Sequence, residues 1–161
     1  MVSLFGTLSI IVFLICAGTL VLHSKLINKR SNTEVFFSNF DNLLRERLEL
    51  YIDLVEDLEE TDTAFNGTEI FDICESYLTA EIRQIIKAWV KIDKATNQIK
   101  SEIEKNEALT TNGKEIAFAI KAYNDNTALY NNNIKKLPWN IIAFAVGFKE
   151  LKPIREFTSF D

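Results

Sequence analysis

The chain has 161 residues and a formal net charge of −5, with five glycines, two prolines and one histidine. The acidic balance argues against a nucleic-acid-binding protein, because such proteins usually carry a basic face. Few helix-breaking residues among many Glu, Lys, Ile and Leu favour long helices in one domain-sized body.

The first element is an apolar run over residues 4–22 that contains neither a charge nor a proline. At about 1.5 Å per residue, a helix of this length just crosses a hydrocarbon core about 30 Å thick. No Lys or Arg precedes the run, and the run is longer than a typical signal-peptide core. We therefore predict an uncleaved transmembrane anchor over residues 1–24.

Cationic residues follow the run at once, as Lys25, Lys29 and Arg30. Because flanking cations stay on the cytoplasmic side, we expect an outward amino terminus and a single-pass cell-membrane protein. Residues 25–161 would then form a cytoplasmic helical bundle domain. We expect the three cations to fix topology, and contact with anionic lipid headgroups is the alternative. Cys16 in the run and Cys74 in the body are too far apart to pair within one chain, which suits a reducing compartment.

A first body helix is predicted over residues 31–60. Ser31 and Glu34 match a capping box that would begin it, and the alternative is an anchor helix that continues unbroken. The stripe that follows has helical spacing and consists of Phe37, Phe40, Leu44, Leu48, Tyr51, Val55 and Leu58. Turn-forming Asp, Asn and Gly within residues 61–68 predict its end.

A second helix is predicted over residues 69–109, with an apolar face of Ile82, Ile85, Trp89, Ile92, Ile99 and Ile103. We expect Gly113 to act as a left-handed cap beyond its end, or else to lie inside a bent but continuous helix. The third helix, residues 113–137, has a seven-residue repeat formed by Ile116, Ile120, Tyr123, Thr127, Tyr130, Ile134 and Leu137. Pro138 should stop it. The predicted class is all-α, an antiparallel bundle of long helices with a short tail helix.

The tail segment, residues 138–148, is mostly apolar and too short to span a membrane. In one interpretation it folds over the bundle end and buries its large apolar side chains, Trp139, Ile142, Phe144 and Phe148. In the other interpretation it is an exposed patch that contacts another copy or a partner. Straight helices would hold it well away from the bilayer, so contact with lipid is not expected.

A repeated Tyr-Asn pair occurs in the third helix, as Tyr123-Asn124 and Tyr130-Asn131. The seven-residue spacing places both tyrosines on one face and both asparagines on the adjacent face. We interpret the four residues as a structural seam of buried, hydrogen-bonded side chains, with a polar ligand-binding seam as the alternative.

Site chemistry is sparse. The single histidine, His23, lies at the membrane boundary, and no phosphate-binding glycine loop, Cys-x-x-Cys or Glu-x-x-His pattern occurs. The acidic residues between 56 and 62 lack the pattern of a calcium loop and are expected to be a solvated helix end. We therefore predict no catalytic residue, no metal site, no cofactor and no enzymatic activity.

Several segments together resemble the LemA family of bacterial membrane-anchored helical proteins. They are the N-terminal anchor, residues 40–56, residues 116–125 with Tyr130-Asn131, and the tail motifs Leu137-Pro138, Ile141-Ile142-Ala143 and Gly147-Phe148-Lys149. The resemblance covers most of the chain. Gly113 and Lys114 stand where the family usually has an acidic residue and an asparagine. The resemblance implies a small external amino terminus, a cytoplasmic helical domain and no established activity.

The expected function is a non-enzymatic, membrane-anchored scaffold that self-associates. Phe118 and Leu129 lie off the main seam of the third helix and are candidates for contacts with a neighbouring copy. The alternative is an adaptor that binds a cytoplasmic or membrane partner protein through its apolar tail. Expected partners are thus membrane lipid and other copies of the chain, with another protein in the adaptor alternative, but no nucleic acid.

Overall fold

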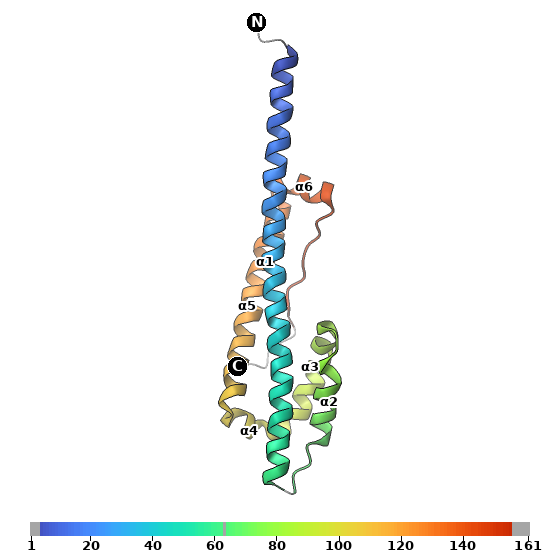
Figure 1. Cartoon of the computed structure of the whole chain (residues 1–161), viewed down its shortest axis with the longest axis vertical. Coiled ribbons are helices and arrows are strands. Elements are labelled where there is room, and N and C mark those ends of the chain that lie inside the picture. Colours follow the sequence, from blue (N-terminus) through green and yellow to red (C-terminus); the bar gives the residue numbers. More distant parts are fainter. Residues whose placement is uncertain (1–3, 63, 156–161) are drawn as a thin grey trace. The chain divides into compact units, whose positions relative to one another are not determined.

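The chain folds into helices, as the sequence predicts. A computed structural model describes residues 4–62 and 64–155, and among these no strand occurs (Figure 1). The elements are α1 (Leu4–Thr61), α2 (Thr68–Leu78), α3 (Ile82–Thr96), the short 3-10 helix η1 (Asn97–Ile99), α4 (Lys100–Lys105), α5 (Glu107–Lys135) and α6 (Trp139–Val146). The all-α class is confirmed.

The chain divides into two compact units, and the helices α1 and α5 each contribute residues to both units. Unit 1 comprises the described parts of Met1–Phe36 and Ala122–Pro153. Unit 2 comprises the described parts of Phe37–Lys121 and Ile154–Asp161. Each unit has its own cluster of buried apolar side chains.

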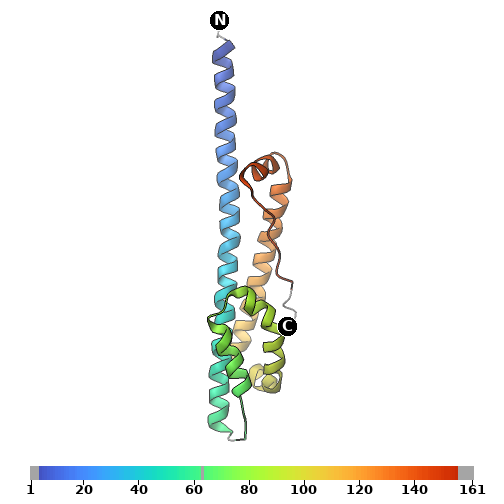
Figure 2. The same ribbon diagram turned by 90° about the vertical axis from the view of Figure 1, so that its right-hand side faces the viewer.

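α1 is one continuous helix from the apolar run to Thr61, so the alternative of an unbroken anchor helix is confirmed and the Ser31–Glu34 capping box is wrong (Figure 2). No proline or glycine interrupts the chain between Gly18 and Gly67. Near the expected start, Thr33 is buried and its hydroxyl donates to the Lys29 carbonyl at 3.0 Å, a bond made inside helices.

The predicted stripe of α1 forms the core of unit 2. Phe40, Leu44, Leu48 and Val55 are completely buried, and they pack with apolar residues of the helices that follow. Those residues include Ile70, Ile73, Cys74, Ile85, Trp89, Ile92, Ile99, Leu109 and Ile116. The second-helix face from Ile85 to Ile99 is therefore buried as predicted, while Ile82 and Ile103 are half-buried.

The predicted turn after α1 is confirmed and is held by side chains. Asp62 Oδ1 accepts from the Ala64 amide at 2.9 Å, and Asn66 Oδ1 accepts from the Thr68 amide at 3.1 Å. Glu59 Oε1 accepts from the Gly67 amide at 2.8 Å. A Cβ at Gly67 would lie 2.2 Å from Val55 Cγ1, so only glycine allows the turn to approach α1 this closely.

The prediction of one long helix over residues 69–109 is wrong, because caps divide this segment. Glu81 begins α3 with a capping box, in which Gln84 Oε1 accepts from the Glu81 amide at 3.2 Å. Arg45 of α1 donates to the carbonyls of Leu78 and Ala80, which lie where α2 ends. Asn106 Oδ1 accepts from the Leu109 amide at 3.0 Å and begins α5.

Gly113 is not a left-handed cap; it lies within α5, so the helix is continuous there. Among the described residues, only Gly147 has a positive φ. A Cβ at Gly113 would lie 3.2 Å from Nη1 of Arg47. The missing side chain leaves room for a buried guanidinium, which donates to the Leu109 carbonyl at 2.9 Å.

Burial raises the pKa of the Cys74 thiol from 9.0 to about 12. Because the thiolate is disfavoured in the folded chain, this group contributes stability below pH 9 that is lost as pH rises toward 12. We expect the free energy of unfolding to fall between pH 9 and 10, and to fall less steeply in Cys74→Ser. Denaturant titration at several pH values measures both slopes. Equal slopes in the two chains would contradict the prediction.

Candidate functional site

The tail segment folds as a short helix with a glycine at its C-cap. α6 follows Pro138, which itself stops α5 as predicted. Gly147 adopts φ 79°, a left-handed conformation that suits glycine. Its amide donates to the Phe144 carbonyl at 3.3 Å, and the Phe148 amide donates to the Ala143 carbonyl at 2.8 Å.

One face of α6 belongs to the apolar cluster of unit 1. Ile142 and Ala143 are buried with Leu26 of α1 and with Tyr130 and Ile134 of α5. Four half-buried side chains pack against this cluster: Leu22, Trp139, Phe148 and Leu151. The rings of His23 and Phe148 lie 6.0 Å apart between centroids. The segment therefore contacts α1 at the end of the apolar run, and the prediction that it lies well away from that run is wrong.

Phe144 is the clear exception to the predicted burial, since 91% of its surface is exposed. Of the four predicted tail residues, Ile142 is buried, and Trp139 and Phe148 are half-buried. Leu137, the last position of the predicted seven-residue seam, is also exposed. α5 ends at Lys135, so Leu137 is no longer on the helix whose face it was expected to extend.

The Tyr-Asn pairs bind the C-terminal segment of unit 1. Tyr123 Oη donates to the Lys152 carbonyl at 2.9 Å. Asn131 makes two bonds to Leu151, because its Nδ2 donates to the carbonyl at 2.8 Å and its Oδ1 accepts from the amide at 2.9 Å. Asn124 is half-buried. These contacts hold residues 148–153 along α5.

Tyr130 is 1% exposed, yet its hydroxyl has no hydrogen-bond partner among the described residues. Burial raises the pKa of Tyr130; the charge of Arg30 opposes this rise and that of Glu34 adds to it. The expectation that buried seam hydroxyls are paired thus holds at Tyr123 and is wrong at Tyr130.

We expect Tyr130→Phe to raise the free energy of unfolding by about 1 kcal/mol, because it removes a desolvated hydroxyl that gains no bond. The matched variant Tyr123→Phe should lower it by a similar amount, since a bond is lost there. Denaturant midpoints of the two variants, compared with that of the natural chain, test both expectations. A loss of stability in Tyr130→Phe would contradict the assignment.

The flanking cations Lys25, Lys29 and Arg30 are all exposed on α1. Arg30 forms an ion pair with Glu34, with 2.9 Å between Nε and Oε1. In the same unit, Lys135 of α5 lies 3.0 Å from Glu150.

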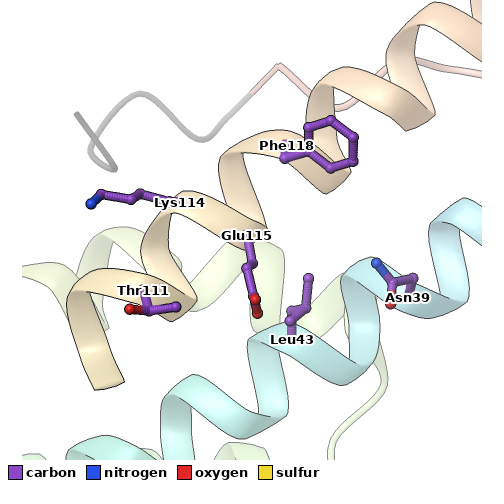
Figure 3. Close-up of a pocket in the computed structure, with 6 residues that line it drawn as sticks. All are labelled: Asn39, Leu43, Thr111, Lys114, Glu115 and Phe118. Carbon is purple, nitrogen blue, oxygen red and sulfur yellow. The ribbon is translucent and has the colours of Figure 1, made fainter. Parts of the chain in front are cut away.

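The candidate contact residues on α5 are exposed, Phe118 by 72% and Leu129 by 58%. Phe118 borders an open groove of about 430 Å³ in unit 2, between α1 and α5. Its lining is Asn39, Leu43, Thr111, Lys114, Glu115 and Phe118. Figure 3 shows Glu115 pointing toward Leu43 across the groove, while Lys114 points away. Within the part of the chain that the structure describes, no three His, Cys, Asp or Glu side chains gather to hold a metal ion.

The fold and these surfaces define an all-α protein, and among the described residues one helix is long and apolar enough to cross a membrane, by its length and composition. No family model, no curated protein and no solved structure matches the chain. Membership of the LemA family therefore stays a prediction from the residues quoted above.

Sequence reasoning missed Arg45, which fixes the C-terminal end of α2, and Arg47, which fixes the start of α5. A signal for Arg47 exists, because it stands three residues after Leu44 and four before Tyr51, within the apolar stripe. A charged residue at such a position predicts a buried hydrogen-bond partner.

Proposed function

We propose that this chain is a non-enzymatic scaffold, anchored in a membrane by the first part of α1, that self-associates in the plane of that membrane. The resemblance to the LemA family and the cations after the run support a bacterial cell membrane and a cytoplasmic body. The observation that carries the proposal is the exposure of the apolar run.

The large apolar side chains from Leu8 to Val21 are at least half exposed, and Phe13 reaches 70%. Nothing else among the described residues covers this stretch, although the same helix is packed against other elements from Leu22 onward. An apolar surface of this length needs an apolar environment, and a bilayer provides one of matching thickness.

Self-association is supported by apolar surface outside the run. Phe118 and Leu129 are eleven residues apart on α5, which places them on one helix face, and both are exposed. Ala17, Gly18 and Thr19 are small residues in the run, and a Cβ at Gly18 would meet no atom within 4 Å. Small residues let neighbouring membrane helices approach closely. Anchoring raises the effective concentration of copies, so modest contacts suffice.

Native mass measurement of the full chain in lipid nanodiscs tests this proposal. We expect defined multimers for the natural sequence and a shift toward monomer for Phe118→Glu combined with Leu129→Glu. The control Val90→Glu changes an equally exposed apolar residue of α3, and it should keep the multimer. A clean monomer of the natural chain at near-native surface density would overturn the proposal.

The adaptor alternative is supported by the exposure of Phe144. Trp139 contributes to the cluster of unit 1, so a polar residue there would disturb folding, and Phe144→Glu is the sharper test. Co-purification of one dominant different protein, lost in Phe144→Glu and kept in Val90→Glu, would favour an adaptor over a self-associating scaffold.

A further inference from the structure

α6 has an apolar face that no other described residue covers. Phe144 and Ile141 are exposed on this face, and Leu137 is exposed just before the helix. The opposite face, Ile142 and Ala143, is buried in the cluster of unit 1. The helix contains no charged residue. A solvated helix normally carries polar side chains on its outer face, so the outer face of α6 requires an apolar environment.

The position of α6 indicates what that environment is. Within unit 1, α6 lies beside α1 at the C-terminal end of α5 (Figures 1 and 2). Its cluster includes Leu22 and Leu26, and the ring of Phe148 contacts His23. Leu22 is the last residue of the apolar run, so α6 is at the level where the proposed span ends.

Exposed apolar residues of the run extend to the part of α1 that α6 contacts. Leu20 and Val21 are exposed immediately before Leu22. Lipid that covers these two side chains would also reach α6, because the cluster of α6 includes Leu22. A partner protein at α6 would have to share this boundary with lipid, which makes lipid the simpler occupant.

The dimensions and flanking residues of α6 suit the membrane interface. Eight residues extend about 12 Å, too short to cross a bilayer but suited to lie in its plane. Trp139 at its start belongs to the residue type enriched at membrane–water boundaries. Exposed lysines stand in the sequence close to residues of its cluster, namely Lys25, Lys29, Lys135, Lys136 and Lys149, of which Lys135 is paired with Glu150. Cations at this level attract anionic headgroups.

We propose that α6 is a second membrane contact. The helix lies in the interfacial layer of the leaflet at which the apolar run of α1 ends, and its side chains Phe144 and Ile141 insert among the upper acyl chains. This inference rests on the proposed anchoring by α1. It adds a lipid-facing surface that holds the body close to the membrane.

Tryptophan fluorescence in vesicles tests the contact with the full chain. The chain has two tryptophans, Trp89 and Trp139, which are both changed to Phe to give a silent background. Phe144→Trp is added to report on α6, and Val90→Trp is added separately as a control on α3. Both new side chains replace exposed residues, so neither disturbs a core. Vesicles contain lipids brominated in the upper acyl chain, which quench nearby indoles.

We expect Phe144→Trp to lose most of its emission in brominated vesicles relative to unbrominated ones, and Val90→Trp to keep its emission. Flotation of the same samples reports anchoring separately. A chain that floats while Phe144→Trp stays unquenched would overturn the lipid contact and leave the anchor standing. Equal quenching of both reporters would also overturn the lipid contact. So would cross-linking that shows a second copy or another protein, rather than lipid, covering the indole of Phe144→Trp. A chain that does not float overturns both proposals.

Discussion

Replacement of Arg47 by alanine is expected to lower the free energy of unfolding by about 3 kcal/mol. Arg47 is 8% exposed, and its Nε donates to Tyr51 Oη at 2.8 Å. Its Nη1 donates to the Leu109 carbonyl at 2.9 Å and lies 3.5 Å from Asn112 Oδ1. Without the guanidinium, these buried acceptors lose their donor and a cavity opens beside Gly113.

The same side chain joins α1 to the first turns of α5. The Arg47 guanidinium lies 5.0 Å from the centre of the Tyr51 ring, and Asn112 Nδ2 donates to the Leu43 carbonyl at 3.1 Å. Arg47→Lys keeps the charge but loses the planar fork that binds several acceptors at once, so we expect an intermediate loss.

Chemical denaturation of the full chain in detergent, followed by helical circular dichroism, measures these losses. Arg83→Ala is the matched control, because Arg83 is exposed on α3 and its removal should change stability by no more than about 0.5 kcal/mol. An Arg47→Ala chain as stable as the control would show that the buried network contributes little.

The long helices were predictable where the apolar period is regular. Phe40, Leu44 and Leu48 recur every four residues, and this stripe alone determines which face of α1 is buried. The breaks around Thr79 and Asn106 were not predictable in this way, because no glycine or proline stands between Gly67 and Gly113 to mark them. The caps that divide the segment include carbonyl contacts from Arg45, more than thirty residues earlier, which no local pattern contains.

The tail illustrates a different limit. Residues 139–146 are almost uniformly apolar, so their period cannot indicate which side is buried. Only the contact of Ile142 and Ala143 with Leu26 and Tyr130 selects one face and leaves Phe144 exposed. Likewise, the seam predicts that Tyr130 is buried, but whether its hydroxyl finds a partner depends on distant segments.

Two arginines in the apolar run, Ile11→Arg with Leu14→Arg, are expected to abolish membrane insertion. Both positions are more than half exposed in the isolated chain, so the change should not disturb either packed unit. Each arginine at the centre of a membrane helix costs about 3 kcal/mol on insertion scales, so the pair costs about 6 kcal/mol. The run is barely long enough to span, which leaves it little apolar surplus to offset that cost.

Carbonate extraction of membranes from expressing cells measures the effect, since it releases peripheral proteins and retains inserted ones. The natural chain should stay in the pellet and the double variant should move to the supernatant. The matched control is Val90→Arg, which adds a cation to an exposed apolar position of α3 and should leave the chain in the pellet. If the double variant stayed inserted, residues 4–22 would not be the element that holds the chain in lipid. The scaffold and the interfacial contact of α6 would then both lose their physical basis.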